Sequence, residues 1–108
     1  MHWTVETLNK AVDEELQVLD PVFKAKFLHI AEMLESFGPH QVREPYVKHL
    51  EDKLWEIRMK ARPGIARAIY VTAKGQRIVV LHAFIKKTQK MPRATLELAR
   101  QRMKEAGL

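Results

Sequence analysis

The apolar positions of the N-terminal third of the chain recur with the period of a helix. The clearest stripe, at spacings of three or four residues, consists of Phe23, Phe27, Ile30, Leu34 and Phe37. This spacing predicts an amphipathic helix that packs its aromatic face into the core. Asp20-Pro21 supplies an N-cap and a proline suited to the first turn, and Gly38-Pro39 ends the helix. Another helix is expected over 8–19, after a short strand around Trp3–Val5.

Between residues 54 and 86 the apolar positions alternate as they do in β-strands. Three strands are predicted, over 54–60, 65–72 and 77–86, and their short connections favour an antiparallel meander. Residues 40–49, which Pro45 interrupts, are expected to form a loop, and Pro92 is expected to open a last helix. We therefore predict one α+β domain over residues 1–108. It has two N-terminal helices packed on an antiparallel sheet, a short first strand and a C-terminal helix.

The third predicted strand is apolar on both faces and ends in positive charge. Regular alternation places His82, Phe84 and Lys86 on one face and Ala83 and Lys87 on the other. The two lysines are therefore expected to have different roles, unless the strand ends between them. A strand that delivers cations to the rim of a sheet is typical of a phosphate-facing site, and a solvated strand edge is the alternative.

Composition and charge narrow the classes of function. The chain of 108 residues is 46% hydrophobic and contains no cysteine, which excludes disulfides and zinc–thiolate sites. No signal peptide or membrane-spanning run is visible, so we expect a cytoplasmic protein with no membrane association. Residues 1–45 carry four Lys and Arg against eight Asp and Glu, whereas residues 46–108 carry fifteen against five. A basic C-terminal half indicates a polyanionic partner, with ordinary surface charge as the alternative.

The chain resembles a known toxin family over nearly its whole length. The ordered segments that carry the resemblance are KHLEDKLWEIR, GIARAIYVTAKGQRIVVLHAFIKKTQK and ELARQRM, together with AKF and FG in the N-terminal helices. They are similar to the phage-derived, HigB-like branch of the RelE/ParE toxin superfamily. The chain departs from the family at Met91, where the family's stretch usually reads Lys-Thr-Pro and supplies a side-chain cap for the last helix.

The resemblance implies a RelE-like fold and the toxin of a type II toxin–antitoxin module. Its partner would be a cognate antitoxin, usually a small DNA-binding protein. RelE and HigB types cleave mRNA in the ribosomal A site without a metal or other cofactor, giving a cyclic phosphate and a free 5′-hydroxyl. ParE types share the fold and inhibit DNA gyrase instead. A degenerate phage-derived domain that only binds its antitoxin is a third alternative.

RNA cleavage of this kind needs a proton acceptor, stabilisation of the phosphorane charge and a proton for the leaving oxygen. The candidate catalytic residues, on three consecutive predicted strands, are Arg58, Arg67, His82, Lys86 and Lys87. The arginines would bind phosphate, His82 would transfer a proton, and the lysines would stabilise charge or act as a base. The alternatives are an ion pair of Arg67 with Glu56, a buried hydrogen-bonded histidine and solvated lysines.

Other residues are candidates for holding the RNA. Tyr70 is a candidate for stacking on a base, with core packing as the alternative. The cations expected to hold phosphates of RNA, or to face solvent, are Lys90, Arg93, Arg100 and Arg102. Trp55 is expected to pack against the helices, with an exposed stacking role as the alternative. No metal site is expected, because the scattered histidines lack ligand spacing, and no Gly-rich phosphate loop or serine triad is present.

Overall fold

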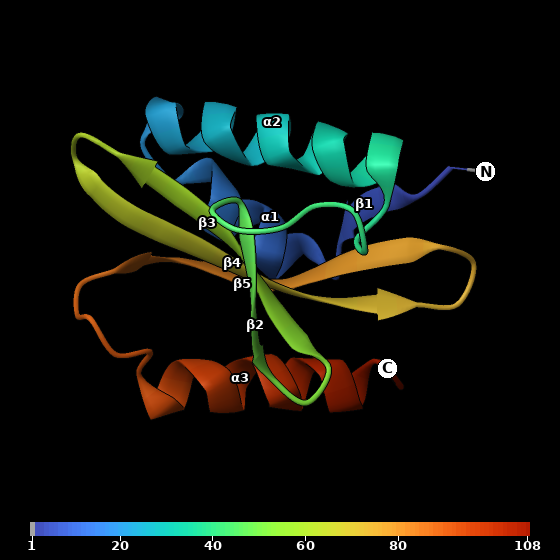
Figure 1. Ribbon diagram of the computed structural model, residues 1–108. Coiled ribbons are helices and arrows are strands. Elements are labelled where there is room, and N and C mark those ends of the chain that lie inside the picture. The colour runs from blue at the N-terminus through green and yellow to red at the C-terminus, as the bar shows by residue number, and fades with distance from the viewer. Residues whose placement is uncertain (1) are drawn as a thin grey trace.

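The computed structural model describes residues 2–108 as three layers, with a five-stranded sheet between helices (Figure 1). The elements are β1 (Thr4–Thr7), α1 (Lys10–Gln17), α2 (Pro21–Phe37), β2 (Val47–Glu51), β3 (Leu54–Ala61), β4 (Gly64–Ala73), β5 (Arg77–Lys86) and α3 (Arg93–Glu105). The strands lie in the order β1-β5-β4-β3-β2. Side chains of α1 and α2 pack on one face of the sheet, here called the α2 face, and those of α3 pack on the other, the α3 face. The predicted α+β class is confirmed.

The bounds of α2 agree with the sequence signals, whereas α1 is two residues shorter at each end than the helix predicted over 8–19. The Asn9 side chain accepts a hydrogen bond from the backbone N–H of Val12 at 3.1 Å and caps α1. Asp20 caps α2 in the same way, with Pro21 in the first turn. At the far end Gly38 has φ +82, and a Cβ there would lie 3.1 Å from the indole nitrogen of Trp3. Glycine is therefore required both by the backbone conformation and by the close approach of this ring.

The three central strands form the predicted antiparallel meander, but the two outer strands differ from the prediction. The loop expected over residues 40–49 is wrong in its last part, because Val47–Glu51 forms β2 and pairs antiparallel with β3. At the other edge β1 pairs parallel with β5, with Val5 opposite Ile78. The sheet is therefore mixed, and the expectation of a purely antiparallel sheet is wrong.

A β-bulge in β5 changes which residues share a face. Tyr70 lies opposite Val80 and Ile69 lies opposite His82, so Leu81 is an extra residue in β5. Val80 and Ala83 consequently pack on the α2 face, whereas Leu81 and Phe84 pack on the α3 face. The strict alternation predicted for this strand is wrong from the bulge onward.

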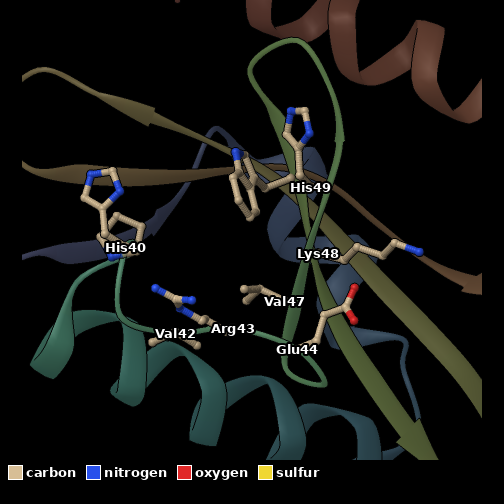
Figure 2. A pocket seen from close by; sticks show the side chains of 9 residues that line it. His40, Val42, Arg43, Glu44, Val47, Lys48 and His49 are labelled. Atoms are coloured by element: carbon tan, nitrogen blue, oxygen red, sulfur yellow. The ribbon is translucent and has the colours of Figure 1, made fainter.

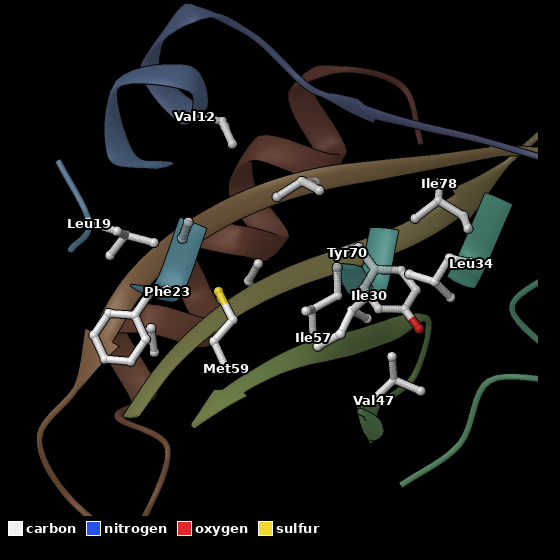
Figure 3. Close-up of a cluster of buried hydrophobic side chains, with 14 of the residues drawn as sticks. Val12, Leu19, Phe23, Ile30, Leu34, Val47, Ile57, Met59, Tyr70 and Ile78 are labelled. Carbon is white, nitrogen blue, oxygen red and sulfur yellow. The ribbon is translucent and has the colours of Figure 1, made fainter. Parts of the chain in front are cut away.

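The core on the α2 face contains most of the predicted helix stripe. Phe23, Ile30 and Leu34 pack there against Met59 and Tyr70 (Figure 3). The last member of the predicted stripe, Phe37, is 64% exposed, so the expectation of core packing is wrong for that residue. Among residues 2–108, no helix combines the length and apolar character needed to span a membrane.

Candidate functional site

Four of the five predicted catalytic residues line one hollow on the molecular surface. On adjacent strands Arg58 lies opposite Arg67, and Ile65 lies opposite Lys86. The chain then leaves β5 through Lys87 and closes a hollow of about 410 Å³, here called the basic hollow. Its lining consists of Arg58, Ile65, Arg67, Lys86, Lys87, Thr88 and Gln89. The meander thus brings together cations that are nearly thirty residues apart in sequence.

A single carboxylate lies between the two arginines of the basic hollow. Glu56 and Arg67 are each 3% exposed, and the Arg67 Nε lies 3.2 Å from the Glu56 Oε1. The other carboxylate oxygen lies 3.4 Å from the Arg58 Nε. The Arg67 Nη1 also donates a hydrogen bond to the carbonyl of Ala66 at 3.1 Å. The ion pair with Glu56, which was the alternative role for Arg67, is therefore present. The Arg67 guanidinium nevertheless lines the basic hollow. The single negative charge of Glu56 balances only one of the two positive charges of Arg58 and Arg67.

The electrostatic surroundings of Lys86 favour its neutral form. Partial burial lowers the pKa of Lys86, the neighbouring Arg67 lowers it further, and Glu56 opposes this shift. Burial likewise lowers the pKa of Arg67, although a guanidinium remains charged at any physiological pH. A lysine with a lowered pKa is a better proton acceptor near neutral pH than an ordinary surface lysine.

Lys86 and Lys87 reach the same hollow because the strand ends between them. β5 ends at Lys86, so the alternation that would send Lys87 to the opposite face no longer applies. The two lysines differ instead in exposure. Lys86 is partly buried and Lys87 is exposed.

The structure places His82 in a different cluster, at the edge of β5. β1 ends at Thr7, opposite Val80, so the following residues of β5 pair with β4 on one side and have no strand partner on the other. The carboxylate of Glu15 accepts a hydrogen bond from the Ala83 N–H at 3.1 Å and lies 2.9 Å from the His82 Nδ1. Because His82 is held by this carboxylate and does not line the basic hollow, the alternative of a hydrogen-bonded structural histidine fits its placement, and the predicted proton transfer does not.

The Glu15 cluster also includes a residue that was expected to bind RNA. The Arg102 Nη1 donates to the carbonyl of Leu81 at 2.8 Å, and its Nη2 lies 2.9 Å from the Glu15 Oε2. Burial acts to raise the pKa of Glu15, but hydrogen bonds from Arg102, His82 and the Ala83 N–H outweigh it, so this pKa is lowered. Arg102 therefore joins α3 to α1 around the open strand edge.

The remaining RNA-binding candidates are mostly engaged within the protein. Tyr70 is 1% exposed in the core of the α2 face, where burial raises its pKa, so the alternative of core packing fits its placement and stacking on a base does not. Arg93 and Arg100 form ion pairs with Glu51 at 3.2 and 2.9 Å. Lys90 is exposed in the loop before α3. Glu56 is predicted from the sequence only as an alternative ion-pair partner of Arg67, and no sequence signal marks Glu15.

Comparison with known proteins identifies the family. Residues 14–104 match the family described as "Phage derived protein Gp49-like (DUF891)". The chain belongs to this Gp49-like family. The Gp49-like chain is also similar to a chain in the crystal structure of the archaeal RelE–RelB complex from Pyrococcus horikoshii, with 30% sequence identity and a TM-score of 0.57. The similarity covers 79% of this chain and 96% of that one. No curated protein matches the chain.

Proposed function

We propose that this Gp49-like protein is the toxin of a type II toxin–antitoxin module and cleaves mRNA on the ribosome. The observation that carries the proposal is the convergence of Arg58, Arg67, Lys86 and Lys87 in one hollow. These four cations come from three strands and the loop after them, and only one buried carboxylate lies among them. The resulting excess of positive charge is suited to binding a phosphodiester. Membership of the Gp49-like family and the similarity to a RelE–RelB complex support the toxin class.

The two arginines would bind the scissile phosphate and oppose the charge of the phosphorane. Each guanidinium presents N–H groups in a planar fork that matches two phosphate oxygens. Arg67 is held in place by Glu56 and by the carbonyl of Ala66, so its remaining N–H groups are oriented before substrate arrives. Such fixed donors stabilise developing charge without reorganising during the reaction.

The two lysines would transfer the protons. Lys86, whose pKa is lowered, accepts the proton of the ribose 2′-hydroxyl while the 2′-oxygen forms its bond to phosphorus. The bond from phosphorus to the 5′-oxygen then breaks, and the ammonium of Lys87 gives a proton to that oxygen. The products are a 2′,3′-cyclic phosphate and a 5′-hydroxyl, and no metal or cofactor takes part in these steps.

The proposed toxin would bind three partners. It acts on mRNA in the ribosome, and a cognate antitoxin neutralises it by direct binding. The similar archaeal structure is a complex of two proteins, RelE and RelB, and this supports the expectation of an antitoxin.

The decisive experiment is translation in a reconstituted system, with mRNA cuts mapped by primer extension. The wild-type protein should stop translation and cut within A-site codons. Lys86→Met should abolish most cutting. Lys74→Gln is the matched control, because it removes a lysine from the turn at the opposite end of the β4–β5 hairpin, where Ala73 pairs with Arg77.

Other outcomes would contradict the nuclease proposal. Uninterrupted translation without cuts excludes it, and inhibition of supercoiling by purified gyrase would assign the protein to the ParE-like class. Harmless overexpression of the chain without its antitoxin would indicate a domain that has kept only antitoxin binding.

A further inference from the structure

A second hollow, with a volume of about 510 Å³, lies beside the edge strand β2. It is formed between the segment 39–44, which follows α2, and the strands β2 and β3 (Figure 2). We call it the Trp55 hollow. Besides Trp55, its basic and aromatic lining consists of His40, Arg43, Lys48 and His49, and Glu44 is its one acidic residue. The sequence does not predict this site, because residues expected to form a loop belong to β2, which places His49 opposite Trp55 and Lys48 opposite Glu56.

Trp55 and His49 form a fixed aromatic wall of this hollow. Trp55 is half-buried against the core of the α2 face, and the His49 ring lies 5.0 Å from it at an angle of 57°. The His49 Nε2 lies 2.7 Å from the carbonyl oxygen of Asp52. A carbonyl only accepts, so the His49 Nε2 carries the hydrogen in this contact. An aromatic face beside a hydrogen-bonding ring is suited to an unstacked nucleobase.

The cations of the Trp55 hollow are available to a ligand. Within the described residues, neither Arg43 nor Lys48 has a carboxylate within ion-pair distance, and both side chains are exposed. This contrasts with Arg93 and Arg100, which pair with Glu51. Unpaired cations beside an aromatic ring can bind the phosphate of a nucleotide whose base stacks on that ring.

Lys48 connects the Trp55 hollow with the basic hollow. It lies directly opposite Glu56 on β3, and that carboxylate contacts Arg67. Figure 2 shows the Lys48 side chain extending away from the side on which His40 and Arg43 lie. The charge of Lys48 also reaches Lys86, whose pKa it helps to lower, after the larger effects of burial and Arg67. Neighbouring strands are ~4.8 Å apart, so positive charge continues across the sheet from β2 to β5.

We propose that the Trp55 hollow binds a nucleotide of single-stranded RNA, flanking the phosphate held in the basic hollow. The base stacks on Trp55 with its edge facing His49, and Arg43 and Lys48 contact the adjoining phosphates. This inference rests on the proposed function, because it takes RNA as the substrate. It adds a second site that binds the same RNA strand.

The test compares two oligonucleotides that cannot be cleaved. Fluorescein-labelled 2′-O-methyl RNAs of two and eight nucleotides lack the attacking hydroxyl, and their binding is followed by fluorescence anisotropy at low salt. The octanucleotide should bind more tightly than the dinucleotide. Trp55→Leu and Arg43→Gln should each weaken octanucleotide binding about ten-fold and leave dinucleotide binding unchanged.

Controls separate this site from the basic hollow and from loss of folding. Lys53→Gln removes an exposed lysine in the β2–β3 turn, outside the lining, and should bind both RNAs as the wild type does. Lys86→Met should weaken both. Arg43 is an exposed loop residue, so its variant tests the site even if Trp55→Leu is poorly folded.

The inference and the proposed function fail in different ways. Wild-type affinity of both Arg43→Gln and Trp55→Leu for the octanucleotide would overturn the inference, as would an absence of measurable octanucleotide binding. Octanucleotide binding that depends on Arg43 and Trp55 supports the inference even where no mRNA is cut on the ribosome. That combination of results would contradict the proposed mRNA cleavage and leave the proposed RNA-binding site standing.

Discussion

Glu56 and Arg67 form a buried ion pair across β3 and β4, and the same carboxylate also contacts Arg58. The Arg67 Nε lies 3.2 Å from Oε1, and the Arg58 Nε lies 3.4 Å from Oε2. Removing either partner of a buried pair leaves an unbalanced charge, which costs more than the pair itself contributes. Glu56 is therefore what allows a buried arginine to line the basic hollow.

A double-mutant cycle on this pair tests that relationship. Arg67→Met should lower the free energy of unfolding by about 3 kcal/mol, because Glu56 is then left buried with Arg58 as its one ion-pair partner. Adding Glu56→Leu should recover most of the loss, since two apolar side chains of similar size replace the charges. Urea denaturation of the two single variants and the double variant gives the coupling energy. A double variant less stable than both single variants would contradict this account.

Replacing Lys86 tests the proposed proton acceptor. Lys86→Met should reduce cleavage by about 100-fold, the usual contribution of a general base. Because partial burial and Arg67, with a smaller effect of Arg58, lower the pKa of Lys86, wild-type cleavage should rise with pH below 10.5, the ordinary value of lysine. Arg58→Gln removes one of these charges and should move the rise to higher pH. Single-turnover rates across a pH series provide the measurement, and an unshifted profile would remove Lys86 from this role.

His82 offers a direct test of its placement outside the basic hollow. His82→Asn retains a side-chain nitrogen that can donate to Glu15, and it removes the titratable ring. Cleavage should fall by much less than the roughly 100-fold expected for the loss of a general acid or base. Primer extension under the conditions used for Lys86→Met makes the comparison. A loss of cleavage activity as large as that of Lys86→Met would show that His82 takes part in proton transfer.

The sequence predicts the parts of this fold that local chemistry determines. Asp20-Pro21 and the helical spacing from Phe23 locate α2, and the turns around Gly64 and Gly75 locate the meander. β2 was missed because Val47 is its one fully buried residue, so its apolar pattern is too short to detect. The parallel pairing of β1 joins segments about seventy residues apart, and no local pattern carries that information.

The sequence likewise predicts one part of the candidate site and not another. The convergence of Arg58, Arg67 and Lys86 follows from the meander once the register is known. The placement of His82 does not follow, because the bulge at Leu81 has no apolar signature. The carboxylate that holds His82 comes from α1, 67 residues away in sequence.

The Glu15 cluster should make part of the stability depend on pH. Burial acts to raise the pKa of Glu15, but hydrogen bonds led by that from Arg102 lower it below 4.5, its ordinary value. A carboxylate whose pKa is lower in the folded state stabilises the protein above the unfolded value and loses that effect as pH falls through the folded one. Glu15→Gln should cost about 2 kcal/mol at neutral pH, and its difference from wild type should shrink below pH 4.5. Urea denaturation at several pH values measures this, and a difference independent of pH would contradict it.

Tyr70→Phe separates a core role from an RNA-binding role. Within residues 2–108, the buried Tyr70 hydroxyl has no hydrogen-bond partner, and the ring packs in the core of the α2 face (Figure 3). The neighbouring Ile69 packs on the opposite face of the sheet. A buried hydroxyl without a partner destabilises the folded state, so its removal should raise the free energy of unfolding by about 1 kcal/mol. Cleavage and octanucleotide binding should stay at wild-type levels, because no base reaches a ring that is 1% exposed. Urea denaturation and anisotropy on the same preparation test both statements. Weaker RNA binding by a variant of unchanged stability would show that the Tyr70 hydroxyl contacts RNA.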